Sequence, residues 1–91
     1  MLYATRYSIR GDRTKERIGA LMSLFGERGE IPGTVAHYTS MDGRGGLLII
    51  DSDDGASLYQ ATLAYQEWLD MSTTPIMAIE DAVPHILASL E

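Results

Sequence analysis

The sequence contains no cysteine, few cations and no long apolar segment. Without cysteine, the chain can form no disulfide and has no thiol for nucleophilic catalysis. No stretch approaches the ~20 apolar residues of a transmembrane helix, and the first residues lack the basic and apolar regions of a secretory signal. The sequence therefore predicts a soluble protein with no membrane partner and a cytoplasmic location.

The charge is unbalanced toward the acidic side. Thirteen acidic and seven basic residues give a net charge of −6. This charge repels phosphate backbones, so nucleic acid is not expected as a partner. Most of the cations lie near the start of the chain, at Arg6, Arg10, Arg13, Lys15 and Arg17. Because Asp12 and Glu16 are interspersed among them, this cluster is more typical of a solvated helix face than of an anion site.

Residues that could hold a metal ion or attack a substrate are sparse. The two histidines, His37 and His85, lie 48 positions apart and define no metal-ligand spacing. The acidic group Asp51, Asp53 and Asp54 is typical of helix capping and solubility. No serine lies in a Gly-x-Ser-x-Gly motif. We expect neither a metal nor a cofactor.

Hydrophobic periodicity predicts alternating strands and helices. Apolar residues recur with a period of two in the predicted strands and at helical spacing in the predicted helices. Asp12 is the expected cap of the first helix, and Asp53 or Asp54 the expected cap of the second. The expected elements are a strand at 2–9, a helix at 13–26, strands at 34–41 and 47–50, a helix at 54–70, a strand at 73–80 and a helix from 81.

A hairpin is expected at the centre of the chain, where residues 42–46 join two predicted strands. Its glycines are expected to supply the positive φ angles of the turn. A phosphate-binding loop is disfavoured because this segment opens no helix. The apolar run 47–50 indicates a central strand that is buried on both faces. Pro75 is expected at a sheet edge, and Pro84 in the first turn of the last helix.

Two strand-helix-strand halves joined by a hairpin predict an α+β, ferredoxin-like β-α-β-β-α-β domain over residues 1–91. In this fold a four-stranded antiparallel sheet carries both main helices on one face. The other face is left open and apolar. Because a soluble protein rarely exposes such a patch, we expect a homodimer that buries it between two sheets.

Several short segments carry a resemblance to a known family. They are the opening strand 2–9, the hairpin 41–47, the segment 50–54, the triplet 68–70 and the triplet 74–76. With these segments in this order, nearly the whole chain resembles the bacterial and phage family called domain of unknown function 3303. The resemblance implies a dimeric α+β barrel and brings no assigned activity.

Two hypotheses about function remain open. In the first, the homodimer binds a small apolar or aromatic molecule, in a pocket between sheet and helices or inside the dimer barrel. Arg6, His37, Tyr38 and Trp68 are the candidate ligand-binding residues, although each also fits an ordinary structural role. His37 is the one plausible general base near neutral pH, and catalysis is left open. In the second, a noncatalytic accessory protein docks a protein partner through the basic first helix.

Overall fold

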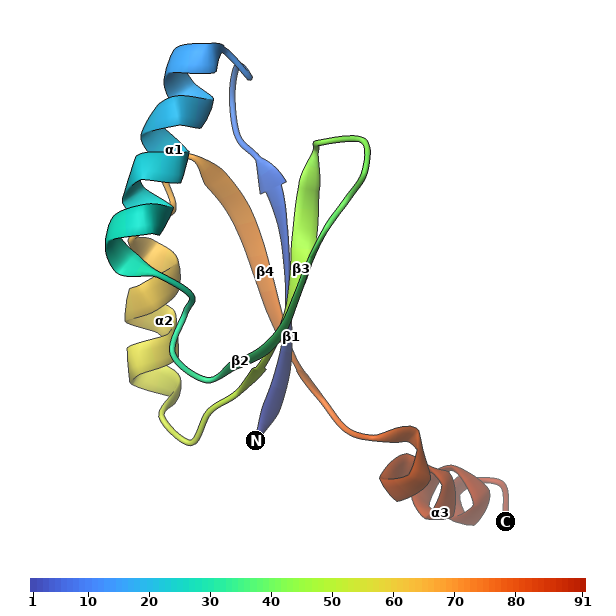
Figure 1. Ribbon diagram of the computed structural model, residues 1–91. Coiled ribbons are helices and arrows are strands. Elements are labelled where there is room, and N and C mark those ends of the chain that lie inside the picture. The colour runs from blue at the N-terminus through green and yellow to red at the C-terminus, as the bar shows by residue number, and fades with distance from the viewer.

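The chain forms four strands and three helices, and the computed structural model describes all residues from 1 to 91. The elements are β1 (Leu2–Ile9), α1 (Lys15–Arg28), β2 (Thr34–Thr39), β3 (Gly45–Asp51), α2 (Gly55–Leu63), β4 (Leu69–Ile76) and α3 (Ile79–Ser89). The strands form one antiparallel sheet in the order β2-β3-β1-β4. Helices α1 and α2 lie together on one side of the sheet (Figure 1). The predicted ferredoxin-like α+β fold is confirmed.

Successive side chains of each strand point to opposite faces of the sheet. Leu48 and Ile50 of β3 pack against Leu58 of α2, so their face is the one covered by the helices. We call it the covered face, and the opposite one the open face. Thr5 pairs with Leu48 and therefore belongs to the covered face. Its neighbour Arg6 pairs with Leu47 on the open face.

The core is small and lies between β3 and α2. It consists of Ile31, Leu48, Ile50 and Leu58, with Tyr3, Tyr7, Ala61 and Met71 packed around it. Thr5 is also fully buried, and its hydroxyl lies 2.8 Å from that of Thr73. Only 8 of the 91 residues are buried, and 13 large hydrophobic residues are exposed in a single copy.

The second half of the chain differs from the predicted boundaries. Helix α2 ends at Leu63 instead of residue 70, and β4 begins at Leu69 instead of residue 73. Between them, backbone amides bond to carbonyls three residues back, which forms tight turns. Leu69 fits the helical spacing of the preceding residues, but it pairs with Ile9 of β1. Cross-strand pairing therefore overrides the helical pattern. Pro75 lies in an edge strand as predicted.

The helix caps are set by side chains close to the predicted ones. Thr14 caps α1 by accepting a hydrogen bond from the amide of Arg17, so the prediction of Asp12 was wrong by two residues. Asp54, one of the two predicted caps, accepts a bond from the amide of Ser57 at the start of α2. The hydroxyl and amide of Ser57 both stabilise the carboxylate, and so hold the pKa of Asp54 below its usual range.

The three glycines of the hairpin have two different roles. Gly43 has a φ of +74°, as predicted for the turn. Gly45 and Gly46 have no positive φ. A side chain at Gly45 would collide with the carbonyl of Tyr7, and one at Gly46 would collide with the hydroxyl of Tyr7. The strand β1 therefore approaches β3 closely at this point, and glycine is required by space rather than by φ.

Helix α3 follows β4 after two residues, Met77 and Ala78, and projects from the sheet on the side away from α1 and α2 (Figure 1). It begins at Ile79, two residues earlier than predicted. Pro84 is therefore its sixth residue and does not lie in the first turn. None of the helices is long and apolar enough to cross a membrane.

Candidate functional site

Three polar side chains form a hydrogen-bonded chain on the covered face. The hydroxyl of Tyr7 lies 2.6 Å from Nε2 of His37, and Nδ1 of His37 lies 2.9 Å from Oε1 of Glu30. An ionised carboxylate can only accept, so His37 donates from Nδ1 to Glu30. Its Nε2 then accepts the hydrogen bond from the Tyr7 hydroxyl. The order is phenol, imidazole, carboxylate.

The strand register brings Tyr7 and His37 together across β3. Tyr7 of β1 lies opposite Gly46, and His37 of β2 lies opposite Leu48. Because Gly46 has no side chain, the Tyr7 ring can reach over β3 toward β2. The rings of Tyr7 and His37 meet edge to face with centroids 5.5 Å apart. Phe25 of α1 approaches the His37 ring at 6.2 Å and fixes it from the helix side.

Glu30 reaches His37 from the loop between α1 and β2. The next residue, Ile31, is buried in the core and anchors this loop against β3 and α2. The side chain of Glu30 is 45% exposed, whereas that of His37 is 24% exposed. The carboxylate therefore stays hydrated, while the imidazole is largely withdrawn from water.

A cavity of about 340 Å³ lies between α1 and the covered face. Nine of its thirteen lining residues are hydrophobic, and Tyr7, His37 and Glu30 lie along its wall. A pocket of this kind suits a small, mostly apolar molecule with one or two polar atoms. The hydrogen-bonded chain then fixes where those polar atoms would lie.

A second tyrosine lines the same cavity. Tyr65 follows α2 and is 6% exposed, and its buried hydroxyl has no hydrogen-bond partner. Leaving such a hydroxyl unpaired costs about 1–3 kcal/mol. Burial raises the pKa of Tyr65, and burial also raises the pKa of Tyr7, with the charge of Glu30 adding to the shift. Both phenols therefore stay protonated at neutral pH and can donate hydrogen bonds.

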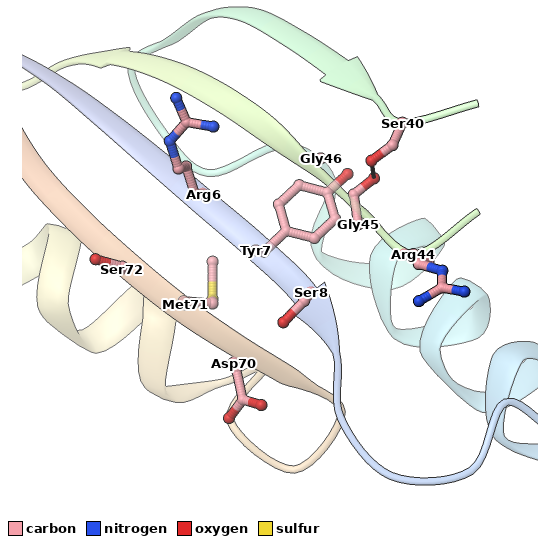
Figure 2. A pocket seen from close by; sticks show the side chains of 10 residues that line it. All are labelled: Arg6, Tyr7, Ser8, Ser40, Arg44, Gly45, Gly46, Asp70, Met71 and Ser72. Atoms are coloured by element: carbon pink, nitrogen blue, oxygen red, sulfur yellow. Dashed lines mark hydrogen bonds between the residues drawn. The ribbon is translucent and has the colours of Figure 1, made fainter. Parts of the chain in front are cut away.

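The open face carries a shallower and more polar groove of about 460 Å³. Figure 2 shows Arg6 and Ser8 on β1, with Asp70 and Ser72 of β4 on one side and the start of β3 on the other. Arg44, in the hairpin, lies at the end of this groove. We call this the Arg6 groove. None of the five ion pairs of the chain includes Arg6.

Comparison with protein families gives a match over nearly the whole chain. The family described as "Domain of unknown function (DUF3303)" matches residues 1–90. The chain belongs to this family. The resemblance drawn from the sequence is thereby confirmed at the level of the family, whose description names no activity. No curated protein matches the chain.

In this DUF3303 member the four predicted site residues do not converge. His37 lies in the wall of the cavity. Arg6 and Tyr38 lie on the open face, where Tyr38 is 65% exposed. Trp68 lies half-buried in the turn before β4 and lines neither the cavity nor the groove. His37 and Tyr38 are adjacent in a strand, so they must point to opposite faces.

Tyr7, Glu30 and Tyr65, which line the cavity, were not among the site residues predicted from the sequence. The strand pattern could have identified Tyr7. It lies two residues after Thr5, so both side chains point to the same face, which is the covered one. Glu30 lies in a connecting segment, where periodicity gives no orientation. Tyr65 continues the helical spacing of Leu58, so the sequence placed it on the core side without indicating a role in a site. No group of three or more histidine, aspartate or glutamate side chains is arranged to hold a metal ion.

Two residues of the basic cluster, Arg13 and Arg17, bond to backbone carbonyls within the chain. Arg13 donates to the carbonyl oxygen of Gly43, and Arg17 donates to the carbonyl oxygens of Arg10, Asp12 and Glu67. These bonds tie the start of α1 to the hairpin and to the turn before β4.

Proposed function

We propose that the protein binds a small, largely apolar or aromatic molecule that carries a hydrogen-bonding oxygen. The observation that carries this proposal is the chain of Tyr7, His37 and Glu30 in the wall of an otherwise apolar cavity. A phenol or a carbonyl compound has the required chemistry, because it pairs an apolar body with one oxygen. Tyr65, whose buried hydroxyl is unpaired, adds a second phenol to the wall of the same cavity.

The same arrangement supports proton transfer. A ligand oxygen at Tyr7 would give its proton to the phenol oxygen while the phenol proton moves to Nε2 of His37. The resulting imidazolium faces the carboxylate of Glu30, which stabilises its charge. A base that is held by a third group is the pattern of many acid-base sites. The geometry therefore supports general acid-base chemistry at the bound oxygen.

The proposal includes a homodimer of the dimeric α+β barrel type, as the resemblance implies. It is supported by the apolar residues that the strand register assigns to the open face. These are Leu2, Ala4, Ala36, Leu47, Ile49 and Ile76. All six are only partly exposed in a single copy, and a second sheet would cover them.

The ligand proposal can be tested with a matched pair of probes, 4-nitrophenol and nitrobenzene, which differ by one hydroxyl. We expect calorimetry to detect binding of 4-nitrophenol with a dissociation constant below about 1 mM. Tyr7→Phe should weaken this binding about tenfold, the loss expected for one or two hydrogen bonds. It should leave nitrobenzene nearly unaffected. His37→Ala should weaken the binding of 4-nitrophenol without unfolding the chain.

Tyr38→Phe is the matched control. It also removes one tyrosine hydroxyl, but from the open face. Its affinity for 4-nitrophenol should equal that of the wild type. Equal losses for Tyr7→Phe and Tyr38→Phe, or no binding of either probe at ~1 mM, would contradict a site in the cavity.

A further inference from the structure

Helix α3 exposes a complete apolar stripe. Ile79, Val83, Ile86, Leu87 and Leu90 recur at helical spacing and share one side of the helix. Each of them is between 40% and 76% exposed. Within α3, Ala82 alone is partly buried. In an amphipathic helix such a stripe normally lies against other apolar surface, which one copy of the chain does not provide.

The helix is also poorly stabilised by itself. It has 11 residues, which is at the lower limit for an isolated helix in water. Its first residue is preceded by Ala78, which makes no side-chain cap. Pro84 lies in its interior, where proline removes a backbone hydrogen bond and costs about 3 kcal/mol. Packing of the apolar stripe is therefore needed to keep α3 helical.

The shape of the single chain shows how much surface is left uncovered. Its accessible surface is 6581 Å² for a mass of 10.0 kDa, about 1,300 Å² more than a folded monomer of that mass exposes. Its radius of gyration is 15.7 Å, against about 12 Å for a compact chain of this length. A stable interface buries about 800 Å² on each partner. The excess is therefore sufficient for a dimer interface.

The distribution of charged residues indicates which kind of side chain lies beside α3. Residues 45–91 contain eight acidic residues and no lysine or arginine. At 3.6 residues per turn, Glu80 lies at the border of the apolar stripe and Asp81 on the opposite side of the helix. The open face offers a matching cation, since Arg6 has no ion-pair partner in its groove. Helix α3 also lies on the open-face side of the sheet (Figure 1).

We propose that α3 packs its apolar stripe against a second copy of this chain, with Glu80 beside the Arg6 groove of that copy. A twofold axis makes the exchange reciprocal, so each copy contributes one α3 and one open face. The linker of two residues, Met77 and Ala78, carries α3 beyond the end of its own sheet. This inference rests on the homodimer proposed above and adds helix α3 to its interface.

A charge exchange tests the pairing directly, with dimer dissociation constants measured by sedimentation equilibrium. Glu80→Arg and Arg6→Glu should each weaken the dimer about tenfold, because each places like charges together. The double variant should return to within about threefold of the wild type. Asp81→Arg is the matched control, since it makes the same charge change on the solvent side of α3. It should leave the dimer unchanged.

The apolar part is tested by Leu87→Asp, which buries a charge in the proposed interface. We expect the dimer to weaken by at least a hundredfold. Because Leu87 is 59% exposed in a single copy, the sheet should stay folded, which circular dichroism can verify.

The possible outcomes separate the two levels of the proposal. A wild-type chain that sediments as a monomer would overturn both the homodimer and the docking of α3. The apolar stripe of α3 would then be assigned to contact with a different protein or with its own sheet. A dimer that Leu87→Asp does not weaken would overturn the docking of α3 alone. A dimer weakened by Leu87→Asp but not by Glu80→Arg or Arg6→Glu would overturn the placement of α3 at the Arg6 groove.

Discussion

The two faces of the sheet are built from similar residues but reach different states. Ile50 and Ile49 are chemically identical neighbours in β3, yet Ile50 is fully buried by α2 and Ile49 is only partly covered. The covered face is completed within one chain and contains the cavity with Tyr7, His37 and Glu30. The open face has no cover in one chain and carries the Arg6 groove. We propose that one face binds a small molecule and that the other binds a second copy.

The largest expected effect separates these two isoleucines. Ile50→Ala should lower the free energy of unfolding by about 2–5 kcal/mol, because it leaves a cavity in the core. Ile49→Ala should cost about 1 kcal/mol in the monomer and more as the protein concentration rises, since in the proposed dimer Ile49 packs against another chain. Urea denaturation at two protein concentrations measures both. Equal, concentration-independent losses would remove the distinction between the faces.

A smaller effect is expected at the unpaired hydroxyl of the cavity. Tyr65→Phe removes a buried group that has no hydrogen-bond partner. The free energy of unfolding should therefore stay the same or rise by about 1 kcal/mol. The affinity for 4-nitrophenol should fall. A loss of stability in Tyr65→Phe would show that the hydroxyl is already paired in the folded chain, and would remove the reason to assign it to a ligand.

The smallest effect concerns pH. Burial raises the pKa of Tyr7 above its ordinary value of 10.0. A raised pKa in the folded state means that the protonated phenol stabilises the fold below pH 10 and that this contribution is lost as the pH rises further. The difference in unfolding free energy between the wild type and Tyr7→Phe should therefore decrease above pH 10. A difference that stays constant or grows there would contradict the burial of this phenol.

The sequence predicted the parts of the fold that depend on local patterns. The strand at Leu2–Ile9 was predicted with its observed bounds because its alternation is uninterrupted, and the hairpin because glycines separate two apolar segments. The end of α2 was not predicted, because Leu69 fits both a helix and a strand until its pairing with β1 is known.

The candidate site was predictable only in part for a similar reason. His37 was identified by its chemistry, since it can act as a base near neutral pH. Its partners depend on the register of three strands and on a loop, which sequence periodicity does not encode. The strand alternation does imply that Tyr38 lies opposite to His37, so these two adjacent residues were never able to share one pocket.

Native mass spectrometry of the wild type and of Leu87→Asp, each with 4-nitrophenol, tests the division of roles between the two faces most directly. We expect the wild type to appear as a dimer with one 4-nitrophenol bound to each chain. Leu87→Asp should appear as a monomer that still binds one molecule, because the cavity is completed within a single chain. A monomeric wild type, or a monomeric variant that has lost the ligand, would contradict this division.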